Sequence, residues 1–221
     1  MSAAGLFFTS LLASTVRLAA PLILAALAGL YAERSGVVDI GLEGKLLFGA
    51  FAGAAIAALS GSAASGLAAA IAAGLLLSML HGWFSIALGG DQIVSGMALN
   101  LVAAGAAPSL AAAWFHQGGA TPPLAAGARF AAIALPLAGP LGGLPIVGPI
   151  YRDVLSGQSL FVYLAWLAVP ATACILGRTR WGLRLRAVGE SPQAVAASGI
   201  SVGGMRWGAL AVGGALCGIG G

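Results

Sequence analysis

The sequence predicts an all-α protein, a polytopic bundle of about six transmembrane helices with one short helix on its cytoplasmic side. The composition is 60% hydrophobic and 7% charged, with a mean hydropathy of +1.01, whereas soluble domains carry about 25% charged residues. Apolar runs close to the roughly 20 residues that a spanning helix needs recur along the chain. Residues 1–221 are therefore expected to form a single integral membrane domain.

The first apolar run predicts a helix from about Leu6 to Tyr31, with Arg17 and Pro21 inside it. No basic region precedes this run, so we expect a first spanning helix and not a cleaved signal peptide. An arginine near the centre of a membrane costs roughly 2.5–3.5 kcal/mol, so Arg17 should face the bundle interior, water or a partner. Alternatively, the helix is shifted and Arg17 lies near the interface.

The stretch Glu33–Lys45, ERSGVVDIGLEGK, separates the first two helices and contains five charges and three glycines. We expect a sharp turn with a short irregular piece that enters the membrane, which is tolerated where protein or a water-filled cavity surrounds it. The alternative is an ordinary interfacial loop. Asp39 and Glu43 are the candidate residues here, either for a solute pathway or for a structural motif.

Five further helices are predicted between short polar connections, and the fourth begins at the turn in GGDQIVSGMALN. Gln92 and Asn100 in that stretch are candidate pathway residues, although neutral polar groups at such places also form hydrogen bonds between helices. His81 is expected to be a packing or interfacial residue. The predicted ranges are about Leu46–Leu59, Ala63–Leu88, Gly89–Trp114, Leu160–Gly177 and from Val202 onward.

The region from Phe115 to Gly157 is rich in proline. Its hydropathy alone predicts a span over Phe130–Ile150, but repeated prolines remove backbone donors and clash with preceding carbonyls. We therefore expect a broken or partly embedded external segment. The prolines concerned are Pro136, Pro140, Pro145 and Pro149.

An arginine-rich segment follows the fifth helix and is expected on the cytoplasmic side. Counting back through five helices places 118–152 and the N-terminus outside. The arginines do not fall on one helical face, which argues against an amphipathic surface helix. They are Arg178, Arg180, Arg184 and Arg186.

A short helix is predicted directly after these arginines. Ser191 can cap its first free N–H groups, and Pro192 suits the first helical position. Gly199 is the expected left-handed stop, with Val195 and Ile200 at the positions that usually make contact in a Schellman ending. About seven residues are too few to span a bilayer or to fold alone, so we interpret this helix as a docking element.

Catalytic motifs are absent from the sequence: neither HExxH nor GxSxG occurs. The pair Gly44-Lys45 does not fit the phosphate-loop pattern, so any ATP hydrolysis is expected in a partner. Cys174 and Cys217 lie in apolar runs and are expected to pack. No cofactor, metal or nucleic acid is expected for this chain.

Three motifs resemble the permease subunits of bacterial ABC importers in the branched-chain amino acid and ribose group, nearest the simple-sugar and nucleoside branch. They are ERSGVVDIGLEG (Glu33–Gly44), GGDQIVSGMALN (Gly89–Asn100) and RTRWGLRLRAVGESPQAVAASGI (Arg178–Ile200). The third motif is the most specific, because it combines many residue types in a fixed order.

The resemblance implies a multi-pass protein of the bacterial plasma (inner) membrane that conducts a small polar solute, a nucleoside or a simple sugar. It implies a second permease subunit, cytosolic ABC ATPase subunits and an extracytoplasmic solute-binding protein. Permeases of this type are usually longer, so the last helices are expected to be missing after Gly221. The residues implied in ATPase coupling are Gly189, Glu190, Ser191, Pro192, Ala194, Ala197 and Gly199.

The alternative function is that of an ion-coupled secondary transporter or channel. Its coupling carboxylate would be Asp39, Glu43 or Asp91. A membrane enzyme is a third class, for which the sequence offers no nucleophile beside either histidine.

Overall fold

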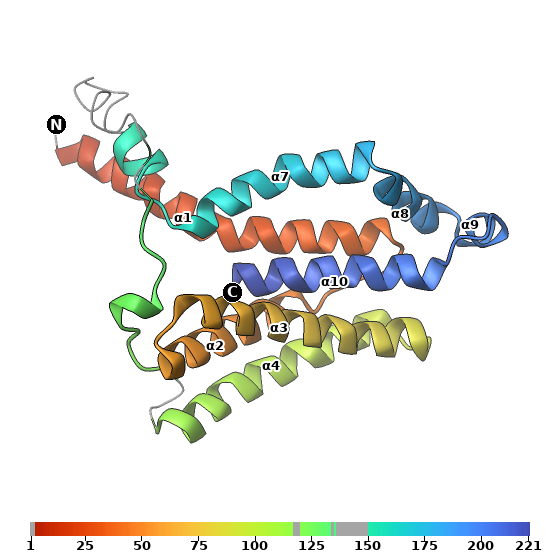
Figure 1. Cartoon of the computed structure of the whole chain (residues 1–221), viewed down its shortest axis with the longest axis horizontal. Coiled ribbons are helices and arrows are strands. Elements are labelled where there is room, and N and C mark those ends of the chain that lie inside the picture. The colour runs from red at the N-terminus through yellow and green to blue at the C-terminus, as the bar shows by residue number, and fades with distance from the viewer. Residues whose placement is uncertain (1–2, 117–119, 134, 136–149) are drawn as a thin grey trace.

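The computed structural model describes residues 3–116, 120–133, 135 and 150–221, and these form helices joined by short connections (Figure 1). In the described ranges, two π-helical turns and one 3₁₀ turn accompany the α-helices: η1 (Trp83–Ala87), η3 (Ile150–Leu155) and η2 (Ala126–Ala128). The α-helices are α1 (Ala3–Arg34), α2 (Leu42–Ser60), α3 (Ala63–Gly82), α4 (Gln92–Phe115), α7 (Leu160–Arg178), α8 (Arg180–Glu190), α9 (Pro192–Ala197) and α10 (Val202–Gly220).

Six helical segments of the described chain are long and apolar enough to cross a membrane, which confirms the predicted all-α polytopic bundle. The third, fifth and sixth begin at the residues that the sequence predicts. They are Phe7–Arg34, Leu42–Ser60, Ala63–Ala87, Gln92–Phe115, Leu160–Arg178 and Val202–Gly220.

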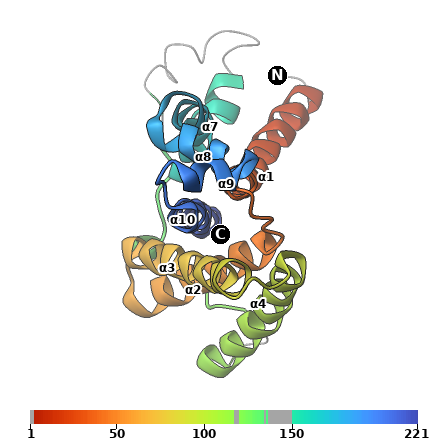
Figure 2. The ribbon, with the colours of Figure 1, turned by 90° about the vertical axis from the view of Figure 1, so that its right-hand side faces the viewer.

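Helix α10 runs through the middle of the bundle, between a group formed by α1, α7 and α8 and a group formed by α2, α3 and α4 (Figures 1 and 2). Glycines permit the close approach of α10 to α3. A Cβ on Gly74 would lie 2.2 Å from the carbonyl oxygen of Gly214, and one on Gly218 would lie 2.5 Å from that of Ala70. In an apolar membrane, where helices gain little from hydrophobic burial, such close backbone packing is a main source of association.

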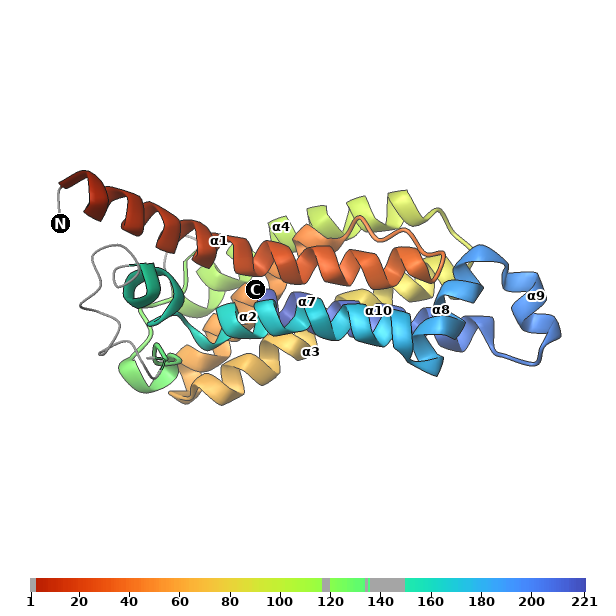
Figure 3. The same cartoon turned by 90° about the horizontal axis from the view of Figure 1, so that it is seen from above.

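Helices α1, α3, α4 and α10 share one end of the bundle with α8 and α9, on the right of Figure 1. Helix α9 projects furthest at this end, as the view from above also shows (Figure 3). At the same end, the predicted turn before α4 is confirmed. Asp91 caps α4 by accepting hydrogen bonds from the N–H groups of Ile93 and Val94 at 2.8 and 3.0 Å.

The predicted broken segment between α4 and α7 is described in part. Helix α4 ends at Phe115, and Ile133 forms an antiparallel bridge with Gln158. The described residues of this region form the short turns η2 and η3. Pro136, Pro140, Pro145 and Pro149 lie outside the described residues.

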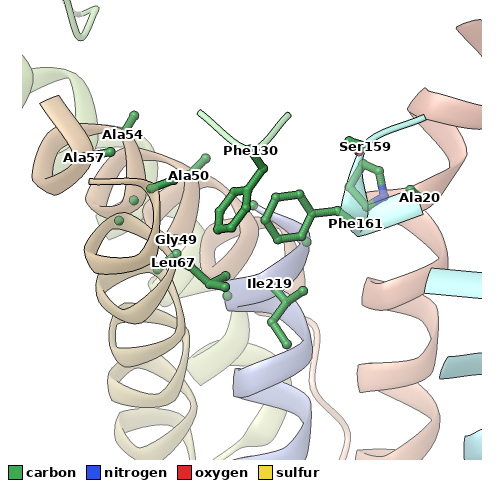
Figure 4. Close-up of a pocket in the computed structure, with 18 of the residues that line it drawn as sticks. Ala20, Gly49, Ala50, Ala54, Ala57, Leu67, Phe130, Ser159, Phe161 and Ile219 are labelled. Carbon is green, nitrogen blue, oxygen red and sulfur yellow. The ribbon is translucent and has the colours of Figure 1, made fainter. Parts of the chain in front are cut away.

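A cavity of about 340 Å³ opens at the other end of the bundle, between α1, α2, α3 and the last turn of α10 (Figure 4). Its walls are mostly alanine and glycine, and the rings of Phe130 and Phe161 meet edge to face there, with centroids 5.1 Å apart. Arg17, an exposed residue within the first candidate span, also lines this cavity. It therefore borders an open space, as expected for an arginine in an apolar helix.

Candidate functional site

The corner between α7 and α8 divides the arginine-rich segment. The Thr179 hydroxyl donates to the carbonyl oxygen of Ile175 at 2.6 Å and accepts from the N–H of Gly182 at 3.1 Å, so it closes one helix and caps the next. A Cβ on Gly182 would lie 2.1 Å from that same carbonyl. Glycine is therefore needed for so tight a corner.

The expectation that these arginines belong to no amphipathic helix is wrong. Arg178 ends α7; of the three arginines in α8, Arg180 and Arg184 share its exposed face, whereas Arg186 is half-buried. The spacing of the arginines in the sequence was misleading because it runs across two helices, α7 and α8. On its inner face, α8 buries Leu185 and Val188, and Leu185 packs in a core cluster with α1, α7 and α10.

The predicted short helix is confirmed as α9, Pro192–Ala197, with Pro192 in its first turn. Gly199 has a φ of 81°, its N–H donates to the carbonyl oxygen of Ala196 at 3.0 Å, and the N–H of Ile200 donates to that of Val195 at 3.3 Å. These two bonds are the Schellman pattern.

The predicted cap by Ser191 is wrong, because its side chain forms no capping hydrogen bond. Its backbone N–H instead donates to Ala187 at 2.9 Å and closes α8. Ser191, the single residue between α8 and α9, thus caps the C-terminal end of α8 through its backbone N–H.

The candidate coupling residues lie together on the projecting end of the molecule (Figures 1 and 3). Val195 is buried and anchors α9 from beneath, while Pro192 is half-buried. The other candidates are exposed: Gly189, Glu190, Ser191, Ala194, Ala197 and Gly199.

Gly189, in the last turn of α8, touches the connection that follows α1. A Cβ there would lie 2.5 Å from the carbonyl oxygen of Arg34 and 3.3 Å from the backbone nitrogen of Gly36. On the other side, Arg206 of α10 donates through Nε to the carbonyl oxygen of Ser35 at 3.3 Å. The base of the projecting element is therefore in direct backbone contact with the α1–α2 connection.

That connection continues as Val37–Ile40, a stretch outside any helix that we call the extended segment, and Gly41 then forms the turn at which α2 begins. The carboxylate of Asp39 forms an ion pair with the ammonium group of Lys45, and both side chains are almost completely buried. Asp39 also accepts a hydrogen bond from the N–H of Gly41 at 3.1 Å. The two charges neutralise each other in a place where either alone would be costly.

Helices α3 and α4 hold the first half of the extended segment. Gln92 accepts a hydrogen bond through Oε1 from the N–H of Val38 at 2.6 Å. Nε2 of His81 lies 3.2 Å from the carbonyl oxygen of Val38, and Nδ1 lies 3.1 Å from the hydroxyl of Ser95. Because a carbonyl only accepts, we assign the proton of a neutral His81 to Nε2, which leaves Nδ1 to accept from Ser95.

Asn100 holds the second half. Its Nδ2 donates to the carbonyl oxygen of Ile40 at 3.1 Å, and its Oδ1 accepts from the N–H of Gly44 at 2.7 Å. Gly44 lies in the first turn of α2, whose N–H groups have no partner within the helix. A side chain from α4 therefore caps α2.

The extended segment descends along α4 from Gln92 to Asn100, a distance of about 12 Å at 1.5 Å per residue. This confirms an irregular piece between α1 and α2 that is packed against α3 and α4, whereas its entry into the membrane stays a prediction. It also explains why α2 begins four residues earlier than the predicted Leu46: Lys45, taken as part of a turn, is neutralised inside the bundle.

Three of the four predicted pathway or structural residues meet at this segment: Asp39, Gln92 and Asn100. Glu43 does not join them, being exposed with no hydrogen bond or ion pair to the described residues. None of the four lines the cavity of Figure 4.

Sequence reasoning missed Lys45, His81 and Arg206 as parts of this arrangement. A lysine six residues after an aspartate, between apolar runs, was an available signal. The histidine and Arg206 bond backbone atoms far away in the sequence, which no local pattern reveals. Within the described residues, no group of three or more His, Cys, Asp or Glu side chains is placed to hold a metal ion.

Comparison with known families matches residues 11–221 to the family described as the branched-chain amino acid transport system permease component. The match covers nearly the whole chain. This chain belongs to that permease family. The predicted resemblance is thereby confirmed, and so is the assignment as a multi-pass membrane protein.

Curated relatives carry the comparison further. The chain is 34% identical over 207 residues to the nucleoside ABC transporter permease NupC of Lactococcus lactis. It is 36% identical over 222 residues to the guanosine ABC transporter permease NupQ of Bacillus subtilis. The identity is 30% over 208 residues with the glucose ABC transporter permease TsgB13 of Haloferax volcanii.

These alignments cover 91%, 94% and 92% of this chain but 62%, 64% and 53% of the three relatives. The chain thus spans between about half and just under two thirds of the length of these relatives. No solved structure matches the chain.

Proposed function

We propose that the chain is a membrane subunit of an ABC importer, forming half of a translocation pathway for a small polar solute without chemical change to it. The carrying observation is α9, an exposed short helix with a Schellman ending that lies in the connection between the candidate spans α7 and α10 of a permease-family member. The relatives' names support a nucleoside or a simple sugar as solute.

The proposed assembly contains a second permease subunit, cytosolic ATPase subunits that receive α9, and an extracytoplasmic solute-binding protein. ATP hydrolysis occurs in the ATPase subunits, and this chain needs no cofactor. The exposed small side chains of α9, Ala194 and Ala197, allow a groove on the ATPase to close tightly around the helix. A short helix in a groove follows the movement of the domain that holds it.

Gly189 provides the route by which this movement reaches the membrane helices. Because it lies against the backbone of Arg34 and Gly36, a displacement of α9 pushes on the start of the extended segment. That segment is tied to α3 and α4 by His81, Gln92 and Asn100, so its displacement changes the packing of the helices at this end.

An ion-coupled carrier is less consistent with the carboxylates. Asp39 is already neutralised by Lys45, and Asp91 is occupied as the cap of α4. Glu43 is exposed, with no described partner through which an ion could act on the bundle.

Deletion of residues 191–199 tests the proposal in cells that express the chain with its ATPase and binding-protein partners. We expect ATP-dependent solute uptake to be lost while membrane insertion, measured by protease accessibility, is unchanged. Uptake that persists after the deletion, or that continues without an ATPase subunit and collapses with an ionophore, would contradict the proposal.

A further inference from the structure

The outward face of α7 is an apolar stripe that ends in an arginine. Leu167, Ala171 and Cys174 are exposed and follow the spacing of one helical face, and Arg178 lies four residues further along the same stripe. A lipid-facing stripe that ends in a basic residue is typical of a helix reaching the membrane surface. An arginine at the end of such a stripe is expected at the level of the lipid head groups.

Helix α8 begins at that level and is amphipathic. Its inner face buries Leu185 and Val188 completely, while its outer face exposes Arg180, Arg184 and, between them, Leu183 at 48%. Long basic side chains keep their charged heads in water while their apolar stems cover apolar surface, so arginines beside an exposed leucine suit the membrane interface.

The anchoring of α8 fits the same placement. Trp181, in its first turn, is half-buried and packs against Tyr31 of α1, with ring centroids 5.9 Å apart. Tryptophan and tyrosine are enriched where membrane helices meet water. The aromatic pair fixes α8 beside α1 and leaves the arginine face directed outward.

The side chains of these three arginines have no partner in the part of the chain that the structure describes. The side chains of Arg178, Arg180 and Arg184 form no hydrogen bond or ion pair with the described residues. The ion pair found in the described part of the chain is the distant one between Lys45 and Asp39. Their guanidinium groups are available to a ligand with negative charge. Guanidinium binds phosphate oxygens through paired hydrogen bonds.

We propose that Arg178, Arg180 and Arg184, with Leu183, form a binding surface for the phosphate groups of anionic phospholipids. Leu183 contacts the upper acyl chains while the guanidinium groups bind the lipid phosphates. The lipid surface is favoured over an acidic protein surface because the arginines continue the apolar stripe of α7. Clusters of basic residues directly beside a membrane helix bind anionic lipids in this way.

Titration of the detergent-solubilised full chain with phosphatidylglycerol or phosphatidylcholine, followed by native mass spectrometry, tests this surface. We expect preferential retention of phosphatidylglycerol, with affinity falling about fivefold for each arginine lost in Arg180→Gln and Arg180→Gln/Arg184→Gln. The lysine variants Arg180→Lys/Arg184→Lys should keep most of the preference. Excess inorganic phosphate should not displace the lipid, because it lacks acyl chains.

Arg129→Gln is the control, since Arg129 is an exposed arginine at the other end of the bundle. It should leave phosphatidylglycerol binding unchanged. Equal loss in this control, or unchanged binding in the double glutamine variant with circular dichroism showing intact helices, would overturn the proposal. So would a double variant that keeps lipid binding and loses only the ATPase subunit, since the arginines would then form a protein interface.

Discussion

The ion pair between Lys45 and Asp39 makes the extended segment possible, because it removes two charges from an otherwise apolar interior. Lys45→Met should lower the free energy of unfolding by about 3–5 kcal/mol, because Asp39 would remain buried and unpaired. Denaturant unfolding in mixed micelles measures this. The double variant Asp39→Asn/Lys45→Met removes both charges and should recover most of the loss; if it is no more stable than Lys45→Met, the pair is not what sustains the segment.

Gly189 and Gly36 meet without side chains, so the contact is sensitive to a single methyl group. Gly189→Ala should reduce ATP-dependent uptake about tenfold, since relieving the overlap with Arg34 costs about 1–3 kcal/mol and displaces the extended segment. Uptake per ATP hydrolysed is the decisive measurement, because a merely misfolded subunit would lower uptake and ATP hydrolysis together.

Gly203→Ala provides the matched control at the start of α10, where an added Cβ would meet nothing within 4 Å. It should retain uptake and coupling. A Gly189→Ala variant that behaves in the same way would show that the contact carries no movement.

At the scale of elements, the rigidity of α9 depends on its left-handed stop. Gly199 has a φ of 81°, so Gly199→Ala should cost about 1–2 kcal/mol and loosen the last turn. Hydrogen exchange should then be faster at the amide of Ile200, which bonds to Val195. Gly177→Ala, in open space near the end of α7, should leave that exchange rate unchanged.

The long helices could be predicted from the sequence because hydropathy and serine or glycine boundaries are local signals. The starts at Ala63, Leu160 and Val202 are confirmed for this reason. Helix α8 was missed because the arginine-rich segment is divided by the corner at Thr179, so the spacing of its arginines does not follow a single helix. Only the packing of α7 against α8 defines this corner. Treating the end of α7 and the whole of α8 as one helix made the arginines look scattered.

The candidate site could be predicted only in outline. Asp39, Gln92 and Asn100 were identified as polar residues in apolar surroundings, but that signal does not tell which backbone atoms they bind. The partners of Asn100 are about sixty positions away in the chain, at Ile40 and Gly44. The predicted capping by Ser191 failed because the same residue must also close α8.

At the scale of the whole molecule, the two ends of the bundle differ in character. One end gathers α8, α9, the end of α1 and the start of α10 around the extended segment (Figures 1 and 3). The other holds the cavity lined by small side chains (Figure 4). The proposed import function requires this kind of division, with force applied at one end and access changed along the axis.

In the proposed function, α9 couples a partner's ATP hydrolysis to this bundle. The most direct measurement is the rate of ATP hydrolysis in vesicles that contain the chain with its second permease and ATPase subunits, with and without solute-loaded binding protein. We predict strong stimulation with the native chain and none after deletion of residues 191–199, although the subunits remain in the membrane. Equal stimulation of ATP hydrolysis with the native chain and with the deletion variant would contradict coupling through α9.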